Sequence, residues 1–158
     1  MFSVHVAETG TDRHRVVVNA KPVTILLVDD DEVDAHAVER GFKQLRIANP
    51  IVRARDGIEA LRLLRARPEE SGIESPFIVL LDINLPRKSG IEVLAELRAD
   101  AELRRTVVFV MTTSRADEDR LAAYDLNVAG YLVKNQLPEA FLASLQMLDR
   151  YWNVVMLP

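Results

Sequence analysis

Short runs of apolar residues alternate along this chain with longer segments whose apolar positions recur every three or four residues. The runs predict five strands, at residues 24–28, 50–54, 77–81, 107–111 and 129–133. The longer segments predict five helices, the last of which begins at Pro138 and ends near Asp149. This alternation predicts an α/β fold, a doubly wound parallel sheet of five strands with helices on both faces.

The helical period also predicts which side chains face the core. The inward-facing positions of the five helices are, in chain order, Val33, Ala37, Val38, Gly41, Phe42 and Leu45; Ile58, Ala60, Leu61 and Leu64; Ile91, Val93, Leu94 and Leu97; Leu121, Ala122 and Tyr124; and Phe141, Leu142, Leu145 and Leu148.

Both ends of the chain lie outside the predicted domain, which spans residues 22–149. Residues 1–21 form an N-terminal arm, either with one short strand around Val16–Val18 or without structure. Residues 150–158 form an apolar tail that carries the only tryptophan, Trp152. Exposed apolar patches mark contacts, so we expect a two-fold homodimer through the last helix and this tail. The alternative is a tail that folds back over its own domain.

The composition excludes several classes of function. A net charge of -4 gives no basic surface for DNA or for anionic lipid. The absence of cysteine excludes disulfides and thiol catalysis, and the three histidines are too scattered to bind a metal. No apolar run approaches the roughly 18 residues of a membrane span, and the first residues are too polar for a secretory signal. We therefore expect a cytoplasmic protein with no membrane partner.

Polar side chains stand at the ends of four predicted strands. Asp29 and Asp30 follow the first strand, Asp82 the third, Thr112 the fourth and Lys134 the fifth. Each of them has an ordinary explanation, such as helix capping for the acids. Together they are more informative, because a parallel sheet brings the carboxyl ends of its strands to one edge, where such folds bind ligands.

Carboxylates crowded at one edge repel each other unless a cation neutralises them. Oxygen ligands without histidine or cysteine suit a hard cation such as Mg²⁺. Asp82 beside that cation stays ionised and is a candidate nucleophile toward phosphorus. Lys134 and Thr112 are then placed to pair with the oxygens of a phosphoryl group. No glycine-rich phosphate loop is present, so a nucleotide is not expected.

The chain resembles the receiver domains of response regulators in bacterial two-component signalling, over about residues 22–149. The motifs that carry this resemblance are Val28–Asp31, Asp56–Leu61, Leu81–Pro86 with Gly90, Thr112 and Gly130–Lys134. It implies a flavodoxin-like fold with strand order 2-1-3-4-5, and a signalling protein that accepts a phosphoryl group rather than an enzyme acting on other substrates. The family usually carries a proline after the lysine, where this chain has Asn135.

The resemblance also implies roles for single residues. Asp82 would accept the phosphoryl group from a sensor histidine kinase. Asp30, Asp82 and the backbone carbonyl of Asn84 would bind Mg²⁺ directly, and Asp29 would bind it through water. Thr112 and Lys134 would sense the phosphoryl group, and Tyr131 would be the aromatic switch residue, so that the surface of the fourth helix, last strand and fifth helix changes.

A narrower resemblance is to single-domain regulators paired with phytochrome-type kinases of bacteria and cyanobacteria, in which dimers are expected. It is carried by Asp29–Asp34, Leu126–Tyr131 and Tyr151–Val155. Two other classes are open. A Mg²⁺-dependent phosphatase with an aspartate nucleophile would need a second aspartate two residues on, where Asn84 stands. A pseudo-receiver, which only binds partners, would not need the intact polar set.

Overall fold

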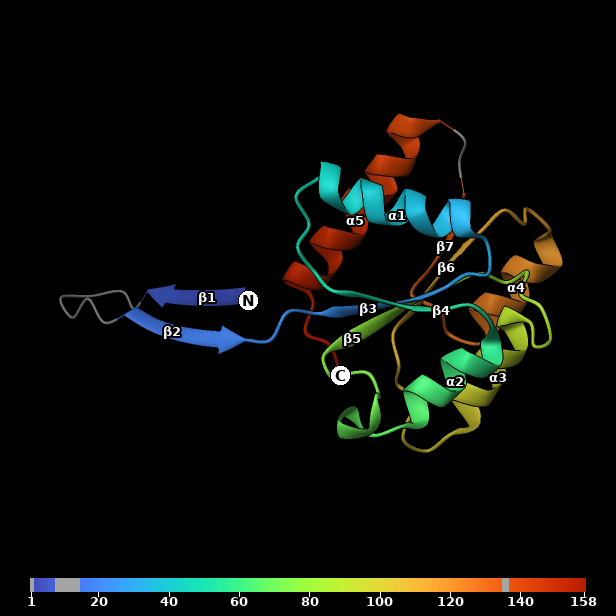
Figure 1. The fold of residues 1–158 in the computed structure, drawn as a ribbon, viewed down its shortest axis with the longest axis horizontal. Helices are drawn as coiled ribbons and strands as arrows, with labels where there is room; N and C mark the ends of the chain where they lie inside the picture. Colours follow the sequence, from blue (N-terminus) through green and yellow to red (C-terminus); the bar gives the residue numbers. More distant parts are fainter. Residues whose placement is uncertain (1, 8–14, 135–136) are drawn as a thin grey trace.

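A computed structural model of the protein describes residues 2–7, 15–134 and 137–158. Five parallel strands form one sheet in the order β4-β3-β5-β6-β7, which confirms the predicted order 2-1-3-4-5 (Figure 1). Their bounds are β3 Thr24–Val28, β4 Ile51–Ala54, β5 Phe77–Leu81, β6 Val108–Thr112 and β7 Gly130–Val133. β5 lies in the middle of the sheet and is flanked by β3 and β6.

Five α-helices follow the five strands. They are α1 Glu32–Gln44, α2 Gly57–Arg65, α3 Gly90–Ala99, α4 Asp117–Asp125 and α5 Pro138–Val154, and a short 3₁₀ turn, η1, spans Pro68–Glu70. The first three helices have side-chain caps: Asp31, Asp56 and Ser89 each accept hydrogen bonds from backbone N–H groups of the first turn. Such caps satisfy donors that have no partner within the helix.

The helices cover the sheet in two layers (Figure 1). One hydrophobic core lies between the sheet and α2, α3 and α4, and it includes Val79, Leu81 and Leu94. The other lies between the sheet and α1 and α5, and it includes Ile78, Leu80 and Leu145. Successive residues of β5 thus enter opposite cores, which is why its sequence is an unbroken apolar run.

Four predicted core positions are wrong. Val33, Ile58, Leu121 and Tyr124 are all exposed, with Val33 the most exposed at 71%. Val33 and Ile58 belong to the first turns of α1 and α2, at the rim of the sheet. In α4 the small side chain of Ala123 is the buried one, so this helix leaves its larger apolar side chains on the outer face.

The predicted end of the last helix is also wrong. α5 continues past Asp149 to Val154, and only residues 155–158 follow it. Trp152 is buried beside Phe42 of α1, with ring centroids 6.1 Å apart, and Tyr151 meets Phe109 of β6 edge-on at 4.9 Å. Packing on the domain therefore extends the helix into the region predicted to be a tail.

The arm before residue 22 contains more structure than one short strand. β1 (Phe2–Ala7) and β2 (Arg15–Ala20) pair antiparallel as a separate two-stranded sheet, in which Phe2 lies opposite Ala20 (Figure 1). None of the helices in the described ranges is long and apolar enough to cross a bilayer.

Candidate functional site

The predicted polar residues converge at the carboxyl edge of the sheet. Asp29 follows β3 and Asp82 follows β5, and these strands are hydrogen-bonded neighbours. The amide of Asp82 donates to the carbonyl of Val28 at 3.0 Å, so the pairing continues to the acid itself. Both carboxylates are buried, whereas Asp30 is exposed at the rim. The sheet register alone thus brings the acids together.

Asp29, Asp30 and Asp82 form a group in which one carboxylate oxygen of each lies within 4.8 Å of the others. This donor set consists of oxygen alone, which is the chemistry that Mg²⁺ and similar hard cations require. Two buried acids and one exposed acid leave an open side toward solvent. The residues therefore fit a divalent cation that keeps some of its water ligands.

Lys134 is the counter-charge of this cluster. Its ammonium group donates to Asp29 Oδ2 at 2.6 Å and to Asp82 Oδ2 at 2.9 Å. It also donates to Asp34 Oδ2, in the first turn of α1, at 2.8 Å. The lysine follows β7, the edge strand, and its side chain crosses the end of the sheet to reach β3 and β5.

Burial and charge act in opposite directions on these groups. Burial raises the pKa of the Asp29 carboxyl above its usual value, and the hydrogen bond from Lys134 offsets part of that rise. Burial alone would lower the pKa of Lys134, but its hydrogen bonds to Asp29, Asp34 and Asp82 outweigh burial and raise it. Lys134 is therefore charged at any physiological pH.

The second oxygen of Asp82 is held by two donors. The hydroxyl of Thr112, fully buried at the end of β6, donates to Oδ1 at 2.8 Å, and the amide of Asn84 donates to the same oxygen at 3.0 Å. With Lys134 on Oδ2, the whole carboxylate is oriented by neighbours from β6, β7 and its own loop. This arrangement fixes the direction from which an electrophile can approach Asp82.

Gly90 explains how the loop after Asp82 stays compact. A Cβ at this position would collide with the carbonyl oxygen of Asp82, and the Gly90 amide donates to the carbonyl of Ile83 at 2.9 Å. The N-terminus of α3 can therefore lie directly against the backbone of the site. A side chain here would force the strand end and the helix apart.

Tyr131 lies half-buried on β7, apart from the acids. Its hydroxyl donates to the carbonyl of Ser114 at 3.0 Å, and the Ser114 hydroxyl in turn donates to Asp119 of α4 at 2.5 Å. Burial raises the pKa of the Tyr131 phenol. These contacts link β7 to the loop after Thr112 and to the first turn of α4.

Sequence reasoning placed Asp29, Asp30, Asp82, Thr112 and Lys134 at one edge, and the structure brings them together there. Sequence reasoning assigned no role to Asp34. The short spacing between Asp34 and the end of β3 could have indicated one, because the first turn of a helix that starts at a strand end must lie over that end. The bond between Lys134 and Asn135, where the family usually has proline, lies outside the described residues.

Three acids, a threonine and a lysine meet at the carboxyl edge of this sheet, which is the arrangement expected of a receiver domain. The family model described as "Response regulator receiver domain" matches residues 25–146, and the chain belongs to this family. Among curated relatives, it is similar to "Response regulator Rcp1" of Synechocystis sp., with 36% identity, covering 87% of this chain and 94% of that protein.

Solved structures give the same assignment. The Mn²⁺-bound form of Rcp1 superimposes with a TM-score of 0.76 at 36% identity, covering 87% of this chain and 99% of that one. The phosphorylated cyanobacterial phytochrome response regulator RcpA superimposes with a TM-score of 0.78 at 32% identity, with the same coverage. The predicted likeness to phytochrome response regulators is thereby confirmed.

Proposed function

We propose that this protein is a phosphorylation-dependent signalling switch in which Asp82 accepts a phosphoryl group from a sensor histidine kinase. The observation that carries the proposal is the setting of the Asp82 carboxylate. Thr112 and Asn84 hold Oδ1, Lys134 holds Oδ2, and two further acids stand within 4.8 Å. A carboxylate that only closed a strand would not need donors from two other strands.

The chemistry is an in-line transfer to one carboxylate oxygen. Asp82 forms the new O–P bond, the bond between phosphorus and the donor breaks, and the donor leaves with its electron pair. Lys134 and Thr112 supply a positive charge and a hydroxyl donor to the phosphoryl oxygens. Asp30, Asp82 and the carbonyl of Asn84 would hold Mg²⁺, with Asp29 acting through water. The cation would neutralise charge on the phosphoryl oxygens.

Support for the cation and the partner comes from relatives. Rcp1 has a Mn²⁺-bound structure and RcpA a phosphorylated one. Mg²⁺ is proposed here because the donor set is all oxygen. The partner is proposed to be a sensor histidine kinase of the phytochrome type, because RcpA is a phytochrome response regulator, and the proposed location is the cytoplasm.

The signal would leave through the surface formed by α4, β7 and α5. When Thr112 turns toward the phosphoryl group it vacates space that the ring of Tyr131 can fill. Two hydrogen bonds connect this ring to α4: Tyr131 donates to the carbonyl of Ser114, and the Ser114 hydroxyl donates to Asp119. Through them α4 would respond. Leu121 and Tyr124 already lie exposed on α4, available for a partner.

An aspartate-nucleophile phosphatase is the second class that was open. Such an enzyme needs an acid two residues after its nucleophile to protonate the leaving group. Asn84 occupies that position, and its side chain cannot donate a proton as an acid does. It is the backbone N–H of Asn84 that contacts Asp82. We therefore propose a phosphoryl acceptor rather than an enzyme that turns over other phosphate esters. A pseudo-receiver is also disfavoured, because all the polar residues of the site are present.

The test is intact-mass measurement after incubation with acetyl phosphate and Mg²⁺. Wild type should gain one phosphoryl mass, and Asp82→Asn should gain none. Asp125→Asn, which removes an exposed acid of α4, is the matched control and should behave as wild type. Equal phosphorylation of wild type and Asp82→Asn would overturn the assignment, and steady release of phosphate from an aryl phosphate would favour the phosphatase.

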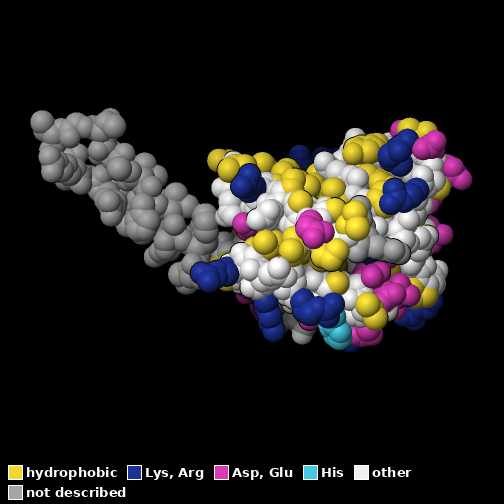
Figure 2. Space-filling view, turned by 90° about the horizontal axis from the view of Figure 1, so that it is seen from above, with side chains coloured by type: hydrophobic (Ala, Val, Ile, Leu, Met, Phe, Trp, Pro, Cys, Tyr) yellow, Lys and Arg dark blue, Asp and Glu magenta, His cyan; other side chains and the backbone are white. Residues whose placement is uncertain are grey.

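We also propose that the protein forms a homodimer through α5 and the residues after it. Apolar side chains gather between charged ones on the face that α1 and α5 cover (Figure 2). Large exposed apolar residues near the end of the chain are Met147, Val154, Val155 and Met156, of which Met156 is 95% exposed. Trp152, by contrast, is buried within its own domain and is not available as an anchor.

A further inference from the structure

The ammonium group of Lys134 is fully occupied by acceptors. It donates to Asp29 at 2.6 Å, to Asp34 at 2.8 Å and to Asp82 at 2.9 Å. An ammonium group has three N–H donors and no acceptor. Any new oxygen that Lys134 binds must therefore displace one of these three carboxylates.

The three carboxylates differ in how easily they can be released. The side chains of Asp29 and Asp82 are only 3% and 8% exposed, whereas that of Asp34 is 35% exposed. A buried carboxylate that loses its counter-charge is strongly destabilised. Asp34 can turn to water, and it lies in the first turn of α1, where the helix dipole stabilises a negative charge. Asp34 is thus the partner that Lys134 gives up most readily.

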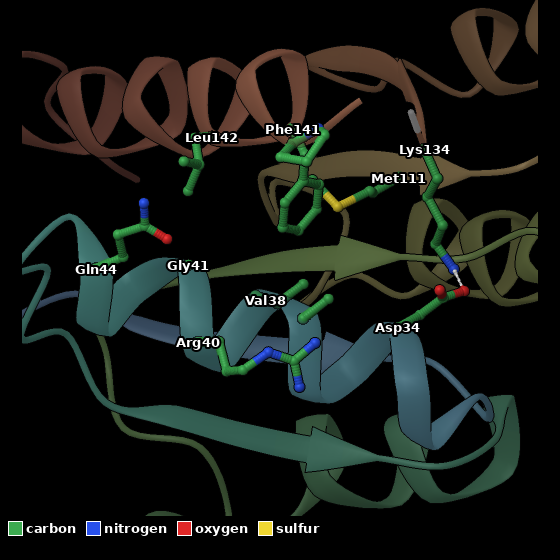
Figure 3. Close-up of a pocket in the computed structure, with 11 residues that line it drawn as sticks. Asp34, Val38, Arg40, Gly41, Gln44, Met111, Lys134, Phe141 and Leu142 are labelled. Carbon is green, nitrogen blue, oxygen red and sulfur yellow. Dashed lines mark hydrogen bonds and ion pairs between the residues drawn. The ribbon is translucent and has the colours of Figure 1, made fainter. Parts of the chain in front are cut away.

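The same ion pair forms one end of a cavity. A space of about 380 Å³ lies between α1 and α5, and Asp34 and Lys134 close it at one side (Figure 3). Its apolar lining includes Val38 of α1, Met111 of β6 and Phe141 of α5. Gly41 permits this close approach of the helices, because a Cβ there would collide with Leu145 of α5.

We propose that Asp34 is a positioning residue that holds Lys134 while Asp82 is unphosphorylated and releases it on phosphorylation, so that the cavity between α1 and α5 changes with the state of Asp82. The proposal rests on the phosphorylation of Asp82 proposed above. A phosphoryl group brings close to two negative charges and three acceptor oxygens. Phosphorylation removes the charge of the Asp82 carboxylate, so one phosphoryl oxygen takes the N–H of Lys134 that Asp82 held. A second phosphoryl oxygen competes for another N–H, and the partly exposed carboxylate of Asp34 yields rather than the buried one of Asp29.

The release of Asp34 by Lys134 would give the protein a second surface that changes on phosphorylation. The face of α4, β7 and α5 responds through Thr112 and Tyr131, whereas the α1–α5 cavity would respond through Lys134 and Asp34. Both surfaces include α5, but the two routes run through different side chains. They can therefore be separated by mutation.

Asp34→Asn tests the proposal, because it removes the charge and preserves the shape. The methyl group of Met111 is the reporter, observed by NMR with ¹³C-methyl methionine. In wild type, beryllofluoride with Mg²⁺ should shift the Met111 signal. In Asp34→Asn without beryllofluoride, that signal should already lie part of the way toward the shifted position.

Phosphorylation gives an independent readout. At a fixed, subsaturating concentration of acetyl phosphate, the phosphorylated fraction of Asp34→Asn should exceed that of wild type, with a steady-state ratio of phosphorylated to unphosphorylated protein about threefold higher, as expected for loss of an ion pair whose carboxylate is partly exposed. Asp34→Glu should restore the wild-type behaviour. Glu39→Gln, on the same helix with no contact to Lys134 among the described residues, should match wild type in both measurements.

The outcomes separate the two proposals. Wild type that gains no phosphoryl mass would overturn the function together with this inference. Wild type that is phosphorylated normally, with Asp34→Asn indistinguishable from it in both readouts, would overturn the role of Asp34 alone. A lower phosphorylated fraction in Asp34→Asn would also overturn it, because Asp34 would then assist the phosphorylated state.

Discussion

The hydroxyl of Thr112 donates a 2.8 Å hydrogen bond to Oδ1 of Asp82 across two neighbouring strands of the sheet. Thr112 is completely buried, so its hydroxyl has no water to turn to when the carboxylate changes. The state of Asp82 therefore decides where this hydroxyl points, and the ring of Tyr131, on the next strand, is next to respond.

The first prediction follows from that contact. Amide hydrogen exchange across residues 117–131 should change when beryllofluoride and Mg²⁺ are added to wild type. In Thr112→Val the change should disappear, because the hydroxyl that couples Asp82 to Tyr131 has been removed. The phosphoryl mass should still be gained from acetyl phosphate, but more slowly, because the same hydroxyl is a proposed donor to the phosphoryl oxygens. A variant that keeps the full exchange response would show that the signal reaches α4 by another path.

The second prediction concerns Asp30, the exposed acid of the cluster. Asp30→Ala should weaken Mg²⁺ binding by about tenfold or more, because a direct carboxylate ligand is lost. Without Mg²⁺ the same change should raise the melting temperature by about 1–2 °C, since it relieves repulsion among like charges near the surface. Thermal melts with and without Mg²⁺ measure both effects. Destabilisation under both conditions would mean that Asp30 is mainly structural.

A third prediction concerns the cap of α2. The backbone N–H of Glu59 and the guanidinium of Arg87 bind the Asp56 carboxylate and hold its pKa below the usual value. An acid whose pKa is depressed in the folded state contributes stability above its unfolded pKa, and this contribution is lost as the pH falls through the folded value. Asp56→Ala should therefore lower the free energy of unfolding by about 1 kcal/mol at pH 7.

Urea unfolding at a series of pH values tests that difference. The difference in the free energy of unfolding between wild type and Asp56→Ala should narrow as the pH is lowered past 3.8, the usual pKa of an aspartate, toward the lower pKa of the folded state. Arg87→Gln is the matched control, and it should cost less, because the Arg87 side chain is 63% exposed. A gap that does not change with pH would show that the carboxylate charge is not involved.

The fourth prediction concerns the proposed dimer. Light scattering at tens of micromolar should give the mass of a dimer for the full chain. Replacing the exposed Met147, Val154 and Met156 by serine should give a folded monomer, since none of these side chains is buried within its own domain. Leu121→Ser on α4 is the control and should leave the dimer intact. A wild-type monomer, or a dimer that survives the triple change, would contradict the proposed interface.

Truncation after Arg150, the simplest test that the sequence suggests, is the wrong experiment for this protein. It would remove Tyr151 and Trp152, which pack on Phe109 and Phe42. Loss of a buried tryptophan costs about 3–5 kcal/mol, so the shortened chain would be destabilised whatever its oligomeric state. Substitution of exposed side chains avoids this.

The three central strands, β3, β5 and β6, could be predicted from the sequence because each is a buried and almost entirely apolar run. The edge strands β4 and β7 are only partly buried and are predicted from short apolar segments between the helical patterns. The site could be predicted because its residues follow those runs directly. The helix faces were harder: a short amphipathic helix such as α4 places either Leu121 or Ala123 toward the sheet with equally plausible periodicity. Only the distance between helix and sheet decides between them, and that depends on the whole core.

Asp34 and Trp152 show two other limits of sequence reasoning. The role of Asp34 depends on a side chain from 100 residues later in the chain. The burial of Trp152 depends on its packing beside Phe42 of α1, more than 100 residues earlier in the chain. Contacts of this kind have no local signal, because they are properties of the assembled layers.

The position of each strand in the sheet also sets how readily its part of the site can open. β5, which carries Asp82, is bonded on both sides and enclosed by both cores, so its amides should exchange with solvent only when the whole domain unfolds. β7, which carries Tyr131 and leads to Lys134, is a four-residue edge strand that is only partly buried. Local opening of β7 should therefore cost less free energy than unfolding of the whole domain. Asp82, the proposed phosphoryl acceptor, thus follows the strand whose amides should exchange most slowly. Tyr131 and Lys134, which would respond to the phosphoryl group, lie on or directly after a strand whose amides should exchange faster.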